Sequence, residues 1–378
     1  MASIRVRPVL CALVSLLAGG RARGAERPLE WRPAFGSTWA LLGASKGTLS
    51  PLLPTRPEWS RRNLADVGFL GSNPALLGAL PALRPKFVPL ALRMESAGNA
   101  GVATTTRPET VGAALEGLER GGAPRRAKTA VDGYYLSELW GLAMGYRAQR
   151  TLRWQDDGSL LSEDGRDFLA GFGAAGEVLA GSGGRLTMGA GIKAAFRQGN
   201  EVSVPGAAAV PGVLLSAYGN RSAFGLGMDI GFVYDAPRVG DWGFQFAGAW
   251  RDLGNTSFSV GGVASTDRRF RPFPNDLNFG LGFSSPKFWD GFQGSFRVEY
   301  GESGRQVSAV ERLSVSTELR LPWLASLTGG FSGSRLSGGV AFRFPYVELE
   351  IGSAAELWGE GAEARVSRSF IFELRGVM

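Results

Sequence analysis

The side chains best suited to chemistry in this sequence are closely spaced acids. Three groups stand out, namely Asp156 with Asp157, Glu163 and Asp164 with Asp167, and Glu348 with Glu350. Two neighbouring carboxyl groups can serve as general acid and general base. The sequence has no histidine, so it lacks the commonest general base, a Ser-His-Asp triad and most zinc ligands. We interpret the acids as polar loops and interior lining, with acid–base catalysis as the alternative.

A second chemical motif is the glycine-rich stretch from Gly189 to Ala194, which superficially resembles a dinucleotide-binding fingerprint. That fingerprint needs a strand before it and a helix after it, so that the phosphate meets a helix N-terminus. Here the alternating pattern continues through the glycines to Phe196. The pattern predicts a strand, and we therefore predict no cofactor and no metal site.

The charge distribution argues against nucleic acid as a partner. The formal net charge is +7, but the only dense basic run is Arg125 to Lys128, which we interpret as a solvated loop. A nucleic-acid-binding protein usually concentrates positive charge on one face.

The first residues have the layout of a secretory signal peptide. Arg5 and Arg7 precede an apolar run from Val9 to Leu17, and Ala22-Arg-Gly24 is a small-x-small cleavage site. We predict a leader over residues 1–24 and export through the inner membrane. The only cysteine, Cys11, lies in this leader, so the mature chain would contain no disulfide.

The composition of the chain is typical of a membrane β-barrel. There are 56 glycines among 378 residues, about twice the usual frequency, together with 23 Phe and 10 Trp, and the mean hydropathy is near zero. Barrel strands alternate apolar residues that face lipid with small or polar residues that face the lumen, so their average hydropathy cancels.

Alternation with period two is clearest in the second half of the chain. In the segment 242–250, Trp242, Phe244, Phe246 and Trp250 share one face, while Gln245 and small residues occupy the other. Further strands are predicted at 140–147, 185–196, 223–234, 276–284, 290–300, 309–320, 324–332, 335–343, 346–353 and 363–375. Many have about the 9–11 residues that cross a bilayer obliquely.

We therefore predict an all-β fold: a transmembrane, antiparallel, up-and-down β-barrel of about 14 strands (12–16) over residues 86–378. A soluble β-sandwich, which also alternates, is the competing fold. The barrel would be preceded by a plug or periplasmic segment at 25–85 and would contain one short helix at 107–120, which Thr106 can cap. Residues 86–92 read as an early strand in which Pro89 favours an edge or a bulge.

One short motif points to a family. Taken alone, Asn73-Pro74 is a turn into a short helix. With Asp66 upstream and Ala75 downstream it resembles the "D…NPA" signature of the FadL-like outer-membrane superfamily, especially the PorV-like and TraF-like branch. Residues 224–234 around Asp229 resemble the branch's "G-x-D-x-G-x-x-Y" strand, and 246–255, with Leu253-Gly254, resemble its "N-L-G" strand. Residues 273–282 are similar to a third strand of that branch.

The resemblance implies a single-chain outer-membrane barrel whose N-terminal segment sits in or against the lumen. FadL itself carries hydrophobic substrates, and PorV-like members serve protein secretion and surface attachment. The expected function is a non-enzymatic barrel for hydrophobic small molecules or for protein export, and the expected partners are outer-membrane lipids, such molecules or exported proteins. The alternatives are an outer-membrane lipid or peptide hydrolase and an open aqueous porin.

Overall fold

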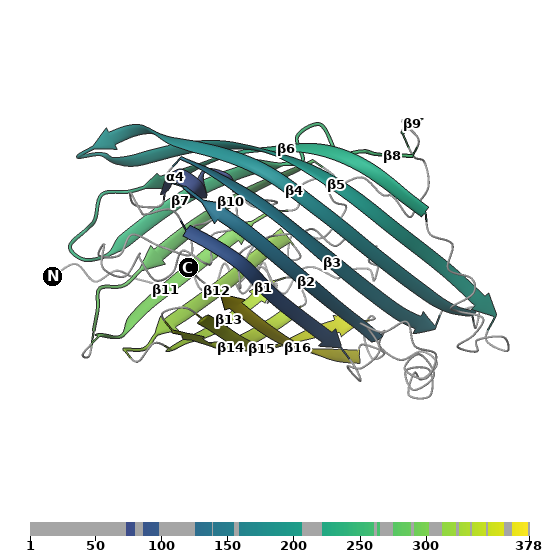
Figure 1. Cartoon of the computed structure of the whole chain (residues 1–378). Coiled ribbons are helices and arrows are strands. Elements are labelled where there is room, and N and C mark those ends of the chain that lie inside the picture. Colours follow the sequence, from purple (N-terminus) through teal and green to yellow (C-terminus); the bar gives the residue numbers. More distant parts are fainter. Residues whose placement is uncertain are drawn as a thin grey trace.

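The structure is a computed structural model, and its fold is all-β, as predicted (Figure 1). It describes residues 73–79, 86–97, 125–137, 139–154, 159–205, 221–260, 263–264, 275–288, 291–301, 312–322, 325–332, 335–344, 347–358 and 365–376. The only helix named in these ranges is the single turn α4 (Leu76–Ala79). No helix among the described residues is long and apolar enough to span a membrane.

Sixteen strands form one sheet. The first seven are β1 (Lys86–Ala97), β2 (Arg125–Leu136), β3 (Trp140–Trp154), β4 (Ser159–Gly181), β5 (Gly184–Pro205), β6 (Arg221–Asp235) and β7 (Gly243–Arg251). A short hairpin follows, made of β8 (Phe258–Val260) and β9 (Val263–Ala264). The remaining strands are β10 (Asp276–Ser284), β11 (Gln293–Tyr300), β12 (Leu313–Arg320), β13 (Ala325–Ser332), β14 (Arg335–Arg343), β15 (Val347–Trp358) and β16 (Arg365–Gly376).

Fourteen of these strands pair in a ring. Each strand from β1 to β6 pairs antiparallel with the next, β7 pairs with β10, and the pairing continues in order to β16. Strand β16 pairs with β1, which returns the ladder to its start. The β8–β9 hairpin lies outside the ring and pairs with β6. The predicted number of about 14 barrel strands is confirmed.

The two faces of the ring have opposite chemistry, as β10 illustrates. Asp276 and Asn278 point inward and are fully buried, whereas Leu277, Phe279 and Leu281 alternate with them and are exposed. In a water-soluble protein the buried and exposed sets would be reversed. The alternation therefore fits a strand whose outer face contacts hydrocarbon.

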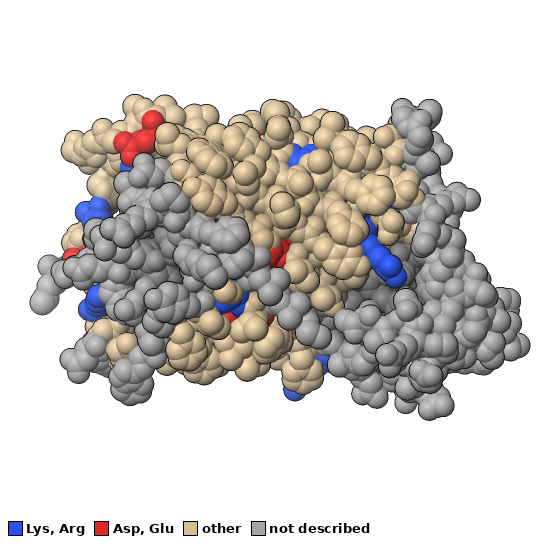
Figure 2. Space-filling model, viewed as in Figure 1, with Lys and Arg blue, Asp and Glu red and all other residues tan. Residues whose placement is uncertain are grey.

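Neighbouring strands repeat this arrangement, so the outward side chains join into an apolar belt. Phe246 on β7 lies beside Phe279 on β10, with ring centroids 6.4 Å apart, and Phe283 packs edge to face on Phe244 at 5.5 Å. Figure 2 shows few charged atoms on the described part of the outer surface. So large an exposed apolar surface is rare on soluble monomers. The strands also form one closed ring and not two packed sheets, so the soluble-sandwich alternative is wrong.

Two early segments test the local predictions. The register of β1 against β2 is irregular between Val88 and Ala91, which confirms the bulge expected at Pro89.

The basic run from Arg125 to Lys128 was predicted to be a loop, and this prediction is wrong because the run forms the start of β2. Strand β2 therefore begins within the basic run, and Lys128 of β2 lies in register with Glu95 of β1. The predicted leader (1–24) and helix (107–120) lie outside the described residues.

A charged substitution on the outer face should reveal its environment. Leu281 lies near the middle of β10 and is exposed, so Leu281→Arg would place a charge against hydrocarbon. We expect the free energy of unfolding in phospholipid vesicles to fall by about 2–4 kcal/mol. Denaturant titration measures this, with Leu281→Ala as the control for lost side-chain volume. An equal, small effect of both substitutions would show that Leu281 faces water.

Candidate functional site

The inner wall formed by β4, β5 and β6 holds the N-terminal segment Asn73–Ala79. Hydrogen bonds within the segment form its turn. Asn73 Oδ1 accepts a hydrogen bond from the Ala75 amide at 3.0 Å, and the Leu76 amide donates to Asn73 O at 3.1 Å. Asparagine favours this turn because its side chain can bond the backbone two residues on. Ala75, Leu76 and Leu77 are buried as a result.

Close approach of this segment to the wall depends on glycine. A Cβ atom at Gly189 of β5 would lie 2.6 Å from both Ala75 N and Pro74 C, and one at Gly231 of β6 would overlap Asn73 Oδ1. Because both wall residues lack a side chain, the two backbones can touch. The Asn73 amide then donates a hydrogen bond to Phe232 O at 3.0 Å, which joins the segment to β6.

Small and apolar side chains surround the segment on the inner face. Gly189 and Gly231 lie directly across the β5–β6 ladder from each other, and Gly231 also faces Ala249 of β7. The other buried members of this inner patch are Ala175, Val233 and Ala247. The inner wall beside α4 is therefore apolar, in contrast to most of the lumen-facing positions of β11–β16.

A buried ion cluster lies further along the same wall. Lys193 Nζ on β5 lies 2.8 Å from Asp229 Oδ1 on β6 and 2.9 Å from Asp252 Oδ1, in the turn after β7. All three side chains are at most 5% exposed. Asp229 also accepts the Asp252 backbone amide at 2.8 Å, and the Thr256 hydroxyl donates to Asp252 at 2.6 Å. One cation thus holds two carboxylates that burial would otherwise disfavour.

The turn after β7 is shaped to reach this cluster. Asp252, Gly254 and Asn255 have positive φ angles of 53°, 80° and 65°, a region that Gly, Asp and Asn tolerate best. The Leu253 amide donates to Met228 O at 2.8 Å, so the turn continues the hydrogen bonding of β6 beyond the end of β7. Phe258 follows the turn, is buried and lies under the Arg197 guanidinium, 4.6 Å from it.

Two of the acids singled out in the sequence, Asp167 and Glu348, form ion pairs with arginines. Arg197 contacts Asp167 at 2.7 Å, and Arg375 contacts Glu348 at 2.9 Å and also Glu373. Glu348 and Glu350 are buried on the inner face, which confirms the predicted interior lining. Asp156 and Asp157 lie outside the described residues. In the described ranges no cluster of three His, Cys, Asp or Glu side chains could hold a metal ion.

The predicted signature residues fall into two neighbouring groups. Asn73 contacts the wall at Gly231, and Pro74 and Ala75 contact it at Gly189. Asp229, Leu253 and Gly254 belong to the ion cluster and its turn. Both groups meet on β6, where Asp229 and Gly231 are two positions apart on the inner face. Asp66 lies outside the described residues. That these residues form a family signature stays a prediction.

Sequence reasoning missed Lys193, the cation on which the cluster depends. Its signal was present: it is the one basic residue among the small and apolar residues 186–196 of a predicted strand. Gly189 and Gly231 were identified as strand residues, but their contact with Asn73 requires the three-dimensional pairing of β5 with β6.

Comparison with known proteins supports the fold. No family model and no curated protein matches the chain. A mutant of the TodX monoaromatic hydrocarbon channel superposes with a TM-score of 0.51 at 13% identity, over 82% of this chain and 94% of that chain. The chain has the outer-membrane β-barrel fold.

Two further solved structures are less similar. The toluene transporter TbuX of Ralstonia pickettii matches at 13% identity and a TM-score of 0.44, over 81% of this chain and 91% of that chain. The CymD monoaromatic hydrocarbon channel matches at 12% identity and a TM-score of 0.42, over 81% and 90%.

The contact between Asn73 and the wall can be tested with one methyl group. In Gly231→Ala the new Cβ would displace the Asn73 side chain, so we expect the amides of Leu76 and Leu77 to exchange hydrogen at least tenfold faster. The control is Gly165→Ala, an inner-face glycine of β4 with no atom within 4 Å of an added Cβ. Equal protection in both variants would contradict the contact.

Removing the cation from the ion cluster should destabilise the barrel. Lys193→Met leaves Asp229 and Asp252 buried without their positive partner, and we expect a loss of about 3–5 kcal/mol in unfolding free energy. Adding Asp229→Asn should recover part of this loss, because it removes one of the two negative charges. Denaturant titration in vesicles measures both variants; a Lys193→Met protein as stable as the wild type would show that the cluster contributes nothing.

Proposed function

We propose that this protein is a non-enzymatic outer-membrane barrel through which hydrophobic small molecules pass. The observation that carries the proposal is the apolar inner patch beside Asn73–Ala79. The patch consists of Ala175, Val233, Ala247 and Ala249 with Gly189 and Gly231, on a ring whose other inner positions are rich in ion pairs. Binding sites for apolar molecules are lined in this way, with few polar groups.

In this proposal the segment Asn73–Ala79 is the part that must move. It fills the lumen beside the apolar patch and is attached to β6 by the Asn73 side chain. This neutral hydrogen bond contributes about 1 kcal/mol, and the burial of Leu76 and Leu77 adds to the attachment. Movement of the segment must break both. The strands behind it, by contrast, are joined by long ladders on both sides of β5.

The proposal extends to a part of the chain of which the structure describes only residues 73–79. We infer that residues 1–24 form a cleaved signal peptide and that residues 25–85 act as a plug. The fold shared with the TodX monoaromatic hydrocarbon channel supports a hydrocarbon as the transported molecule. The resemblance to PorV-like proteins supports an export role instead, but no contact among the described residues favours it.

A removable cross-link tests whether the segment must move. A Cβ at Gly78 would lie 2.7 Å from Thr187 Cγ2, close to the position that a sulfur at residue 187 would occupy. The Thr187 hydroxyl is buried and makes no hydrogen bond within the described structure. The double variant Gly78→Cys, Thr187→Cys can therefore form a disulfide, and the predicted mature chain has no other cysteine.

The measurement is uptake of radiolabelled toluene by intact Gram-negative cells that lack other hydrocarbon channels. We expect uptake by the oxidised double variant to fall to the level of cells without the protein, and a reductant to restore it. The Thr187→Cys single variant is the control: it cannot form the disulfide and should take up toluene as the wild type does in both the oxidised and the reduced state. If the oxidised and reduced forms take up toluene equally, the segment does not gate passage.

A further inference from the structure

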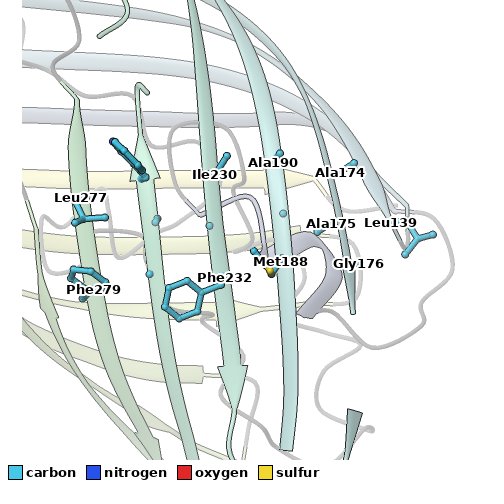
Figure 3. A pocket seen from close by; sticks show the side chains of 15 residues that line it. Leu139, Ala174, Ala175, Gly176, Met188, Ala190, Ile230, Phe232, Leu277 and Phe279 are labelled. Carbon is cyan, nitrogen blue, oxygen red and sulfur yellow. The ribbon is translucent and has the colours of Figure 1, made fainter. Parts of the chain in front are cut away.

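The outer wall of the ring carries an apolar depression of about 790 Å³ (Figure 3). Residues from five strands and from the β2–β3 turn line it: Leu139, Ala174, Ala175, Gly176, Met188, Gly189, Ala190, Ile230, Gly231, Phe232, Gly248, Ala249, Trp250, Leu277 and Phe279. None of these side chains is charged. The depression opens on the outer face, where Met188, Trp250 and Phe279 are exposed.

Small outward residues create the hollow, and large ones surround it. Ala174 of β4 lies across the ladder from Ala190 of β5, and Gly248 of β7 faces Phe232 of β6. The Phe232 ring covers Gly248, since a Cβ there would lie within 3 Å of two ring atoms. The flanking outward residues Phe172, Met188 and Ile192 carry longer apolar chains and are exposed, so the wall is locally indented at Ala174 and Ala190.

The depression is not a hole through the wall. Across it β5 pairs with β6 at Met188–Phe232 and Ala190–Ile230, and β6 pairs with β7 at Phe232–Gly248 and Ile230–Trp250. On the inner side the same stretch of wall is covered by Asn73, Pro74 and Ala75. An occupant must therefore enter from the membrane and not from the lumen.

The shape of the depression favours a chain-like occupant. It crosses β4, β5, β6, β7 and β10, and five adjacent strands at about 4.8 Å spacing extend over about 19 Å. A groove that is long, uncharged and open to hydrocarbon suits an extended alkyl chain. We propose that this depression is a binding site for one acyl chain of a membrane lipid, which gives the barrel a tightly held lipid.

A photoreactive lipid tests the site on the unaltered protein. The full chain is reconstituted with phosphatidylethanolamine that carries a diazirine in one acyl chain, and the labelled peptides are mapped after illumination. We expect labelling at residues 188–190, 230–232 and 248–250 to exceed labelling of the outward residues of β14–β16 by at least fivefold. Even labelling around the barrel would overturn the proposal.

A matched pair of double variants tests the same site by filling the depression with protein side chains. Ala174→Leu with Ala190→Leu fills the depression, whereas Ala170→Leu with Ala194→Leu adds the same volume at the cross-strand pair four residues away on the same two strands. Both doubles add apolar volume to the lipid-facing wall, so both should fold. Native mass spectrometry counts bound phosphatidylethanolamine after detergent exchange.

We expect the first double variant to lose one tightly bound lipid and the second to retain it. Retention by both, or loss by both, would overturn the proposal. A wild-type dimer that only the first double variant abolishes would assign the depression to a second copy of the chain and would also overturn it.

Discussion

A backbone that crosses hydrocarbon must satisfy its own hydrogen bonds, because each unpaired amide or carbonyl group there costs several kcal/mol. The ring formed by 14 of the described strands meets this requirement through antiparallel pairing of successive strands and one pairing between the two ends of the chain, in which β16 returns to β1. Closing the ring leaves no free sheet edge in the belt, and the pleat then places alternate residues of every strand in lipid and in the lumen.

This division explains why the interior is so rich in buried charge. Side chains that cannot face lipid must pair with one another inside, as Lys193 does with Asp229 and Asp252, and Arg375 with Glu348. Such pairs stabilise a wall only while both charges are present. On β4–β7 near α4 the inner positions are small and apolar instead, and there the N-terminal segment packs against the glycines of β5 and β6.

The sequence predicts the local part of this structure well. Alternation alone places β10 at 276–284 and β14 at 335–343, with the bounds that the structure has. It also predicts which face each residue takes, because side-chain direction along a strand is a local property. It fails for the start of β2, since the basic run from Arg125 to Lys128 has the composition of a loop and becomes a strand by pairing with β1 and β3.

The candidate site is harder to predict because its contacts join distant parts of the chain. Asn73 and Phe232 are separated by 159 residues, and Lys193 and Asp229 by 36. The motif resemblance selected Asn73, Asp229 and Leu253 one strand at a time, but it could not show that they meet on one stretch of β6. The wall depression is also invisible in the sequence, since Ala174, Ala190 and Gly248 become one surface only when the strands are in register.

The division of each strand between lipid and lumen can be measured directly. A nitroxide label is attached at each position from 276 to 284 of β10 in turn, and its collision rates with oxygen and with a water-soluble nickel complex are measured in lipid vesicles. We expect high oxygen accessibility at Leu277, Phe279, Leu281 and Phe283, and low values at the positions between them. A profile without a period of two, or with maxima at Asp276, Asn278 and Gly280, would contradict a barrel whose outward side chains face hydrocarbon.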